Sequence, residues 1–294
     1  MPAALRQLRQ ELTGRMRNGA THVITGMPED RRAALARRAR EGRASRALLR
    51  TAAGWYARAP VPVAGGLAHL LRVSTADLPL DHAHAGLIVR GTLEPPVQEA
   101  LRRLLAPGAV FYDVGANIGF FTILGARLVG PQGRVVAFEP VPACARAVAR
   151  NIAINGFENA DVREQAVGAA GGRERLLVVG EASWSHLAST GRHADVRDEL
   201  DVAVVAIDDL VGAGAIPPPD VVKIDTEGAE LQALAGMRAT IERHRPAIVC
   251  ELHDTNEPFA ALMDELGYTT TNLDGPAPVA TAGPVHALAQ ARAS

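Results

Sequence analysis

The chain has 294 residues, of which 48% are hydrophobic, and a formal net charge of −1 at pH 7. This length and hydrophobic content suffice for one large domain with a buried core, or for one domain with an extension. The net charge near zero excludes an overall bias toward binding nucleic acid. Two cysteines, Cys144 and Cys250, are too few for a disulfide framework, and their spacing does not match a zinc site. No apolar run approaches ~18 residues and the start lacks a signal-peptide core, so the sequence predicts a soluble, cytoplasmic protein without a membrane span.

The first part of the chain is basic. Residues 1–60 hold thirteen arginines against four acids. We interpret residues 1–66 as a helical extension with a solvated basic surface, and residues 67–294 as the functional domain. Nucleic-acid binding is the weaker interpretation, because aromatic residues do not alternate with the arginines. The extension could also cover the active site or pair with a second copy of the chain.

The rest of the chain predicts an alternation of strands and helices. Residues 67–93 indicate short strands and turns, and a helix begins at Glu94-Pro-Pro96, since proline is favoured in the first helical turn. Further strands are predicted at 109–114, 134–138, 161–167, 174–179, 202–206, 220–225, 246–252, 268–272 and 285–289. Helices are predicted at 118–129, 142–155, 208–210, 228–243 and 256–266. This alternation favours an α/β domain with a parallel sheet covered on both faces, whose ligand site lies beyond the carboxyl ends of the strands.

The first motif is a glycine turn between a strand and a helix. The strand ends in Asp113, the turn reads Gly115-Ala-Asn-Ile-Gly119, and the next strand ends in Glu139. An acid at that second strand end can accept hydrogen bonds from a ribose diol. Asn117 occupies the position where a dinucleotide-binding turn has its second glycine, which argues against a bound pyrophosphate. The pattern therefore favours a nucleoside without phosphate, such as S-adenosylmethionine, whose ammonium group Asp113 could hold.

The second motif is a buried strand that ends in charged residues. Lys223 is the one lysine of the chain. Lys223 and Asp225 are two positions apart in a strand, so their side chains point to the same side. They form either a pair at the floor of the substrate site or a buried ion pair that holds strand and helix together. Glu227 either contacts substrate or is an acid favoured at the start of the following helix.

Two further positions have both a functional and a structural interpretation. His253 follows a strand that ends at the same edge of the sheet, and a histidine that titrates near neutrality could accept a proton from a substrate. It could equally be structural. Trp184, followed by Ser185 and His186, lies between strands, where it could stack on adenine or substrate or simply anchor a loop.

Together these motifs resemble the FkbM-type family of S-adenosylmethionine-dependent methyltransferases over about residues 80–275. The matching segments are Gly91-Thr-Leu-Glu-Pro95, Asp113-Val-Gly-Ala-Asn-Ile-Gly119, Ala137-Phe-Glu-Pro140, Asn151, Asn155-Gly156, Ala166-Val-Gly168, Lys223-Ile-Asp-Thr-Glu-Gly-Ala-Glu230, Arg245-Pro246 and Glu251. The resemblance implies a Rossmann-like, seven-stranded, mostly parallel sheet with helices on both faces and an antiparallel last strand. It also implies methyl transfer, usually to an oxygen of a small molecule or sugar, as in natural product biosynthesis.

The site residues can be grouped by expected role. The residues expected at the cofactor are Asp113, Gly115, Asn117, Gly119, Glu139 and Val167. The expected catalytic residues are Asp225 or His253 as the base, with Lys223 stabilising developing oxyanion charge. The residues expected at the substrate are Glu94, Trp184, Glu227 and Glu251.

Alternatives remain open at this point. In a rival mechanism, Asp225 and Glu251 share Mg²⁺ with a substrate diol, because hard cations take oxygen ligands. The chain could also be a nicotinamide-dependent oxidoreductase, a non-catalytic protein that binds the same cofactor, or an RNA methyltransferase that uses the basic extension. The identity of the hydroxyl acceptor is not predicted.

Overall fold

In the part of the chain that the structure describes, the main sheet has seven strands. The computed structural model describes residues 60–74, 82–179, 185–187 and 196–292. The strands are β3 (Val110–Val114), β4 (Arg134–Phe138), β5 (Ala160–Arg163), β10 (Val221–Ile224), β11 (Ala247–Leu252), β12 (Tyr268–Asn272) and β13 (Val285–Ala291). Their order is β12-β13-β11-β10-β3-β4-β5, β13 is antiparallel to both neighbours, and every other pair is parallel. The predicted Rossmann-like, mostly parallel sheet is confirmed.

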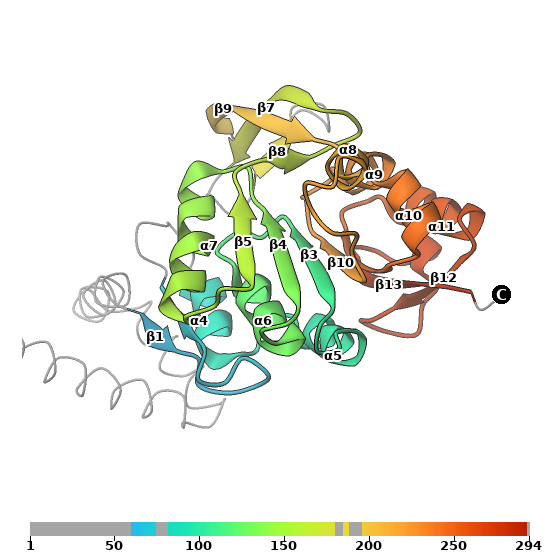
Figure 1. The fold of residues 1–294 in the computed structure, drawn as a ribbon. Coiled ribbons are helices and arrows are strands. Elements are labelled where there is room, and N and C mark those ends of the chain that lie inside the picture. The colour runs from blue at the N-terminus through green and yellow to red at the C-terminus, as the bar shows by residue number, and fades with distance from the viewer. Residues whose placement is uncertain (1–59, 75–81, 180–184, 188–195, 293–294) are drawn as a thin grey trace, which may run out of the picture.

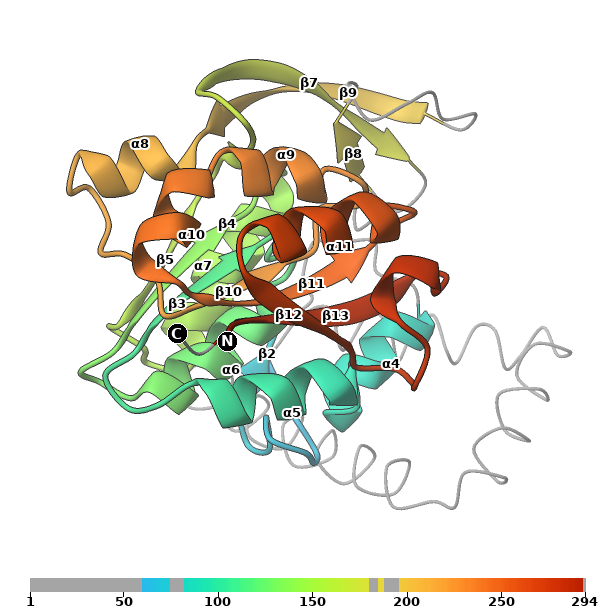
Figure 2. The ribbon, with the colours of Figure 1, turned by 90° about the vertical axis from the view of Figure 1, so that its right-hand side faces the viewer.

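Helices cover both faces of this sheet (Figures 1 and 2). One layer contains α4 (His82–Arg90), α5 (Pro95–Leu104), α6 (Phe120–Val129) and α7 (Pro142–Ile154). The other contains α8 (Ile207–Gly212), α9 (Glu230–Ala235), α10 (Arg238–His244) and α11 (Asn256–Glu265). Neighbouring residues of β3 point to opposite faces, so Phe111 is buried in the first layer and Tyr112 in the second. The continuous apolar run of β3 is explained by burial on both sides.

A smaller sheet crosses one end of the main sheet, at the top of Figure 1. Its strands are β6 (Ala166–Val167), β7 (Gly172–Val179), β8 (Ser185–Leu187) and β9 (Val196–Val205), in the order β6-β9-β7-β8. The single strand predicted at 161–167 is in fact two strands, β5 in the main sheet and β6 in the smaller one. Val167 thereby lies in the sheet that crosses the strand ends.

Two predicted elements are wrong, for identifiable reasons. Residues 82–90 form α4 and not strands and turns; Gly86 weakens the helical signal, but burial of Ile88 against the core favours the helix. The helix predicted at 228–243 is broken at Gly236, where a Cβ atom would lie 1.9 Å from the carbonyl oxygen of Gly168. Close packing of these two backbones ends α9 there.

The segment before α4 packs on the main domain. Strands β1 (Val61–Pro62) and β2 (Arg72–Val73) pair with each other, and Val63 and Val73 belong to the same buried cluster as the first helical layer. The arginine-rich residues 1–59 lie outside the described residues. Among the described helices, none has the length and apolar character needed to cross a bilayer.

Candidate active site

The glycine turn after β3 lies against the end of β10. Gly115, Asn117 and Gly119 all have positive φ angles, of 80°, 52° and 83°. A Cβ atom on Gly115 would lie 1.8 Å from the carbonyl oxygen of Asp225. Glycine is therefore required at position 115 by the close approach of the chain's own backbone at Asp225. The consequence is that Asp225 is held directly beside the turn.

A row of buried charges lies beneath this turn. Asp113 and Lys223 are paired across β3 and β10, and both are buried. Asp113 accepts a hydrogen bond of 2.6 Å from the Thr122 hydroxyl, and the Lys223 ammonium donates to Asp225 Oδ2 at 3.0 Å. Burial opposes the charge of Lys223, but the carboxylates of Asp225 and Asp113 raise its pKa. The prediction that Lys223 and Asp225 point to the same side is confirmed.

A cavity of about 570 Å³ opens at the carboxyl ends of β3, β4, β10 and β11. Val167 and Leu176 of the smaller sheet form part of its wall. Its polar lining residues are Glu94, Asn117, Glu139, Gln165, Asp225, Thr226, Glu227, Glu251 and His253, with His84 at the side of α4. The cavity thus brings together most of the residues predicted from strand ends. Asp113, Gly119 and Lys223 are not among its lining residues and lie behind the wall.

Glu139 is fixed at one part of this cavity by backbone donors. Its carboxylate accepts hydrogen bonds from the backbone N–H groups of Asn117, at 2.7 Å, and Val141, at 2.9 Å. Burial raises the pKa of Glu139 to about 7, although these two hydrogen bonds favour its charged form. The Asn117 side chain leaves a buried Oδ1 with no hydrogen-bond partner among the described residues. The turn and Glu139 therefore offer a fixed acceptor and a free amide oxygen to a ligand.

His253 is held between acidic side chains. Its Nδ1 lies 2.9 Å from Oε1 of the fully buried Glu230, and its Nε2 lies 3.3 Å from Oε2 of Glu227. Burial opposes protonation, but the hydrogen bond to Glu230 and the charge of Glu227 raise the pKa of His253 to about 9. The sequence-based expectation that His253 titrates near neutrality is wrong, because these partners stabilise the imidazolium. The protonated form of His253 therefore predominates at neutral pH.

Two carboxylates in the same cavity are suited to accept a proton. Burial raises the pKa of Asp225 to about 6, despite the neighbouring Lys223. Burial and the charge of Asp225 raise the pKa of Glu227 to about 7. Groups that titrate close to the working pH are effective general bases. The cavity therefore contains two carboxylates, Asp225 and Glu227, that can accept a proton near neutral pH.

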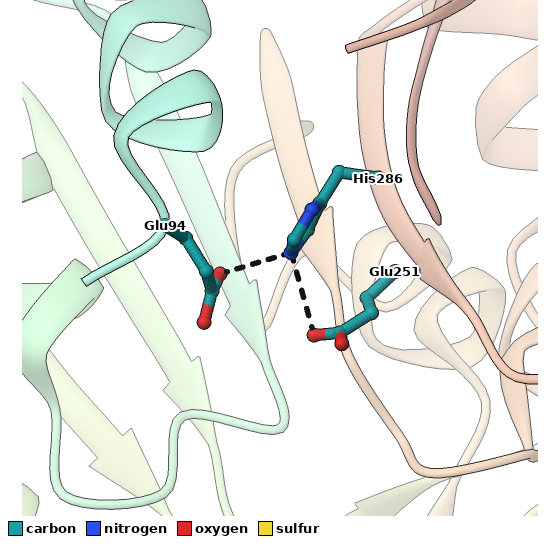
Figure 3. Close-up of side chains that lie close together, drawn as sticks. All are labelled: Glu94, Glu251 and His286. Carbon is teal, nitrogen blue, oxygen red and sulfur yellow. Dashed lines mark ion pairs between the residues drawn. The ribbon is translucent and has the colours of Figure 1, made fainter. Parts of the chain in front are cut away.

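A second histidine, His286, was not predicted from the sequence. It lies on β13 opposite Glu251 of β11, and Figure 3 shows its imidazole between the carboxylates of Glu94 and Glu251. Its Nε2 is 3.5 Å from Glu94 Oε2 and 3.7 Å from Glu251 Oε2. Burial opposes ionisation of Glu251, but His286 holds its pKa down to about 2. The sequence signal for this residue was one polar side chain in the otherwise apolar strand Val285-His-Ala-Leu-Ala. The pairing of that strand with β11, which places His286 opposite Glu251, could not be predicted from the sequence.

The comparison with known proteins decides the family. Residues 113–272 match the family described as the methyltransferase FkbM domain. The chain belongs to this FkbM family. A relative, the 31-O-demethyl-FK506 methyltransferase FkbM of Streptomyces tacrolimicus, is 29% identical over 195 residues, which cover 56% of this chain and 74% of that protein. The hexuronic acid methyltransferase AglP of Haloferax volcanii is 30% identical over 173 residues, or 55% of this chain and 64% of that protein.

A solved structure of the same family is also similar. The methyltransferase FkbM from Methylobacillus flagellatus KT is 18% identical, with a TM-score of 0.42, over 74% of this chain and 63% of that chain. As a member of the FkbM family, the chain is an S-adenosylmethionine-dependent methyltransferase, and S-adenosylmethionine is its cofactor. This decides against the nicotinamide-dependent oxidoreductase.

The cavity of this FkbM-type protein fits such a cofactor. Its volume lies within the range of roughly 300–1,000 Å³ that is usual for small-molecule sites. Glu139 offers a carboxylate, and Asn117 offers an amide oxygen that has no hydrogen-bond partner among the described residues. Cys144 also lines the cavity, and both cysteines are buried thiols that form no disulfide. Trp184 lies outside the described residues, and only the backbone of Ser185 and His186 is described, in β8.

Proposed function

We propose that this methyltransferase transfers a methyl group to a hydroxyl oxygen of a small molecule, a sugar or a natural product. The observation that supports this most is the shared cavity. One part holds Glu139 and Asn117, and another holds the carboxylates of Asp225 and Glu227, which can accept a hydroxyl proton. Two relatives are named for methyl transfer to 31-O-demethyl-FK506 and to a hexuronic acid. Both names are compatible with an oxygen acceptor.

In this proposal Glu139 and the turn hold the cofactor. The Glu139 carboxylate would accept hydrogen bonds from the ribose hydroxyls, and Asn117 and Val167 would contact the nucleoside. When bound, S-adenosylmethionine supplies an activated methyl group. Asp113, Gly119 and Lys223 lie behind the cavity wall and do not contact the ligand in this proposal. Lys223, next to Asp113, donates a hydrogen bond to Asp225 and so holds its carboxylate in place. Gly119 allows α6 to start close to Val148. Their roles are thus in positioning.

Asp225 is our choice of base. Its backbone packs against the glycine turn, where a Cβ atom on Gly115 would lie 1.8 Å from the Asp225 carbonyl oxygen. Its carboxylate oxygen Oδ2 lies 3.0 Å from the Lys223 ammonium. A positioned base contributes roughly 10²–10⁴-fold to such a reaction, and alignment of the two reactants contributes further. Glu94, Glu227 and Glu251 would orient the acceptor. The protonated His253 would hold Glu227 in place.

Mg²⁺ shared by Asp225 and Glu251 is not part of this proposal. The ammonium of Lys223 already neutralises Asp225 at 3.0 Å, and its positive charge opposes a second cation on the same carboxylate. Removing Mg²⁺ from the assay is expected to leave turnover unchanged.

Ligand binding tests the cofactor half of the proposal. S-adenosylhomocysteine is expected to raise the unfolding temperature of the protein, because a ligand that binds the folded state stabilises it. NAD is expected to cause no shift, since Asn117 occupies the place of the glycine that admits a pyrophosphate. A differential scanning fluorimetry titration measures both. A shift with NAD but not with S-adenosylhomocysteine would contradict the proposal.

The pH profile tests the acceptor half. A protonated carboxyl group cannot accept a proton, so kcat/KM should rise with pH through the pKa of Asp225, about 6, and level off above it. The measurement is the initial rate of S-adenosylhomocysteine formation between about pH 5 and 8 with a hydroxyl acceptor that the wild type methylates. In Glu227→Gln the rise should persist. A flat profile, or loss of the rise in Glu227→Gln alone, would exclude Asp225 as the base.

A further inference from the structure

Two buried polar atoms beside the cavity lack hydrogen bonds. They are Oε2 of Glu94 and Nε2 of His286, and neither has a hydrogen-bond partner among the described residues. They face each other at 3.5 Å, and Oε2 of Glu251 lies 3.7 Å from the same nitrogen. Buried polar atoms are normally hydrogen-bonded, so these two unpartnered atoms, one on Glu94 and one on His286, call for an explanation.

The orientation of His286 is fixed from its other side. Asp274 accepts hydrogen bonds at Oδ2 from the backbone N–H of His286, at 2.7 Å, and pairs with the ring Nδ1 at 2.9 Å. A carboxylate on Nδ1 makes that nitrogen a donor and points Nε2 toward Glu94 and Glu251. This is the arrangement that carboxylates give to histidines that bind metal ions.

The spacing fits a shared cation better than a direct hydrogen bond. Charge-assisted N–H···O bonds are about 2.7–2.9 Å long, as the contact with Asp274 is, but both contacts of Nε2 are longer. Two ligand atoms at about 2.0–2.1 Å from one metal ion, at an angle near 110–120°, lie about 3.3–3.6 Å apart. The ligand atoms of Glu94, Glu251 and His286 all lie within 4.8 Å of one another.

We propose that Glu94, Glu251 and His286 bind a divalent transition-metal cation, with Asp274 orienting the imidazole. An imidazole nitrogen with two carboxylates suits Zn²⁺, Mn²⁺ or Fe²⁺, whereas Mg²⁺ prefers oxygen ligands alone. Three protein ligands leave a coordination position open. Because Glu94 and Glu251 line the cavity, that position is available to an acceptor oxygen; this last role, unlike cation binding itself, rests on the proposed function.

A second trio, Asp225, Glu251 and His253, has the same spacing but is less suited to a cation. Asp225 pairs with Lys223, and the two ring nitrogens of His253 contact Glu230 and Glu227. Its ligand atoms are therefore already partnered. The two trios share Glu251, so variants of the residues that they do not share distinguish them.

The test is Zn²⁺ binding to the whole chain after treatment with EDTA and removal of the chelator. Calorimetric titration with ZnCl₂ should give one site per chain, and Co²⁺ should give visible absorption bands at the same stoichiometry. Any proton displaced from Nε2 passes to the buffer. His286→Asn keeps a donor for Asp274 but has no atom at Nε2, so it should weaken binding at least 100-fold, as should Glu94→Gln. Asp274→Asn should weaken it by about 10–100-fold, as an orienting residue does.

Three controls complete the design. His244→Asn removes an exposed histidine, and Asp225→Asn and His253→Asn remove ligands of the second trio; all three should keep the site. S-adenosylhomocysteine binding by each variant reports its folding and tests the cofactor site separately. Should His286→Asn fail to fold, the isosteric Glu94→Gln decides. The proposal is overturned if the wild type does not bind Zn²⁺ with one-to-one stoichiometry, or if Asp225→Asn or His253→Asn loses the site while Glu94→Gln keeps it.

Discussion

Asp225→Asn is expected to lower kcat by about 10²–10⁴-fold, the usual contribution of a general base. Asparagine retains an oxygen that can accept the hydrogen bond from Lys223, but it cannot take a proton from the acceptor. The remaining carboxylates near Lys223, on Asp113 and Glu94, keep that ammonium charged. The variant should therefore fold and bind S-adenosylhomocysteine with nearly unchanged affinity. The measurements are the transfer rate from S-adenosylmethionine and the affinity for S-adenosylhomocysteine by calorimetry.

Glu227→Gln is the matched control for this variant. It removes a second carboxylate from the same cavity, two residues along the chain, with the same change from acid to amide. We expect its main effect on the KM for the acceptor, because Glu227 orients the substrate in our proposal. If Glu227→Gln loses kcat by about 10²–10⁴-fold while Asp225→Asn does not, the roles of the two residues must be exchanged.

Lys223→Met is expected to destabilise the fold by about 3–5 kcal/mol, because removing one partner of a buried ion pair leaves an uncompensated charge. Methionine keeps an apolar stem beside Phe121, where the ammonium lies 4.9 Å from the ring centre. What is lost is the cation that faces the buried carboxylate of Asp113 on β3 and the carboxylate of Asp225, which follows β10. Urea unfolding followed by circular dichroism measures the change in the free energy of unfolding.

Arg238→Met is the control for this variant. Arg238 forms ion pairs with Glu242 and Glu265 on the surface, where its side chain is 43% exposed. Exposed pairs contribute about 0–1 kcal/mol, so its loss should be small. If Lys223→Met costs no more than Arg238→Met, the buried charges are not what holds β3 and β10 together at the site.

Much of the fold could be predicted because its signals are local. The buried strands β3 and β4 are largely apolar, and they are followed by the glycine turn and by Glu139, respectively. The split between β5 and β6 and the break at Gly236 could not be predicted. Both depend on close contacts between backbone segments that are far apart in the sequence, such as the contact of Gly236 with Gly168. Local sequence patterns do not predict such contacts.

The site divides in the same way. Asp113, Glu139, Asp225 and Glu251 could be found because parallel strands end at one edge of the sheet. The distance of each residue from the cavity surface could not be predicted. Asp113 and Lys223 were expected to contact the ligand, but they lie behind the cavity wall. The protonation of His253 depends on Glu230, which is 23 residues away, and the position of His286 depends on the register of β13. These are tertiary properties.

The most direct measurement is a crystal structure of the full chain with S-adenosylhomocysteine. We expect the ribose hydroxyls to contact the Glu139 carboxylate and the sulfur atom to face the part of the cavity lined by Asp225 and Glu227. A ligand bound outside this cavity, or a ribose that does not contact Glu139, would contradict this expectation.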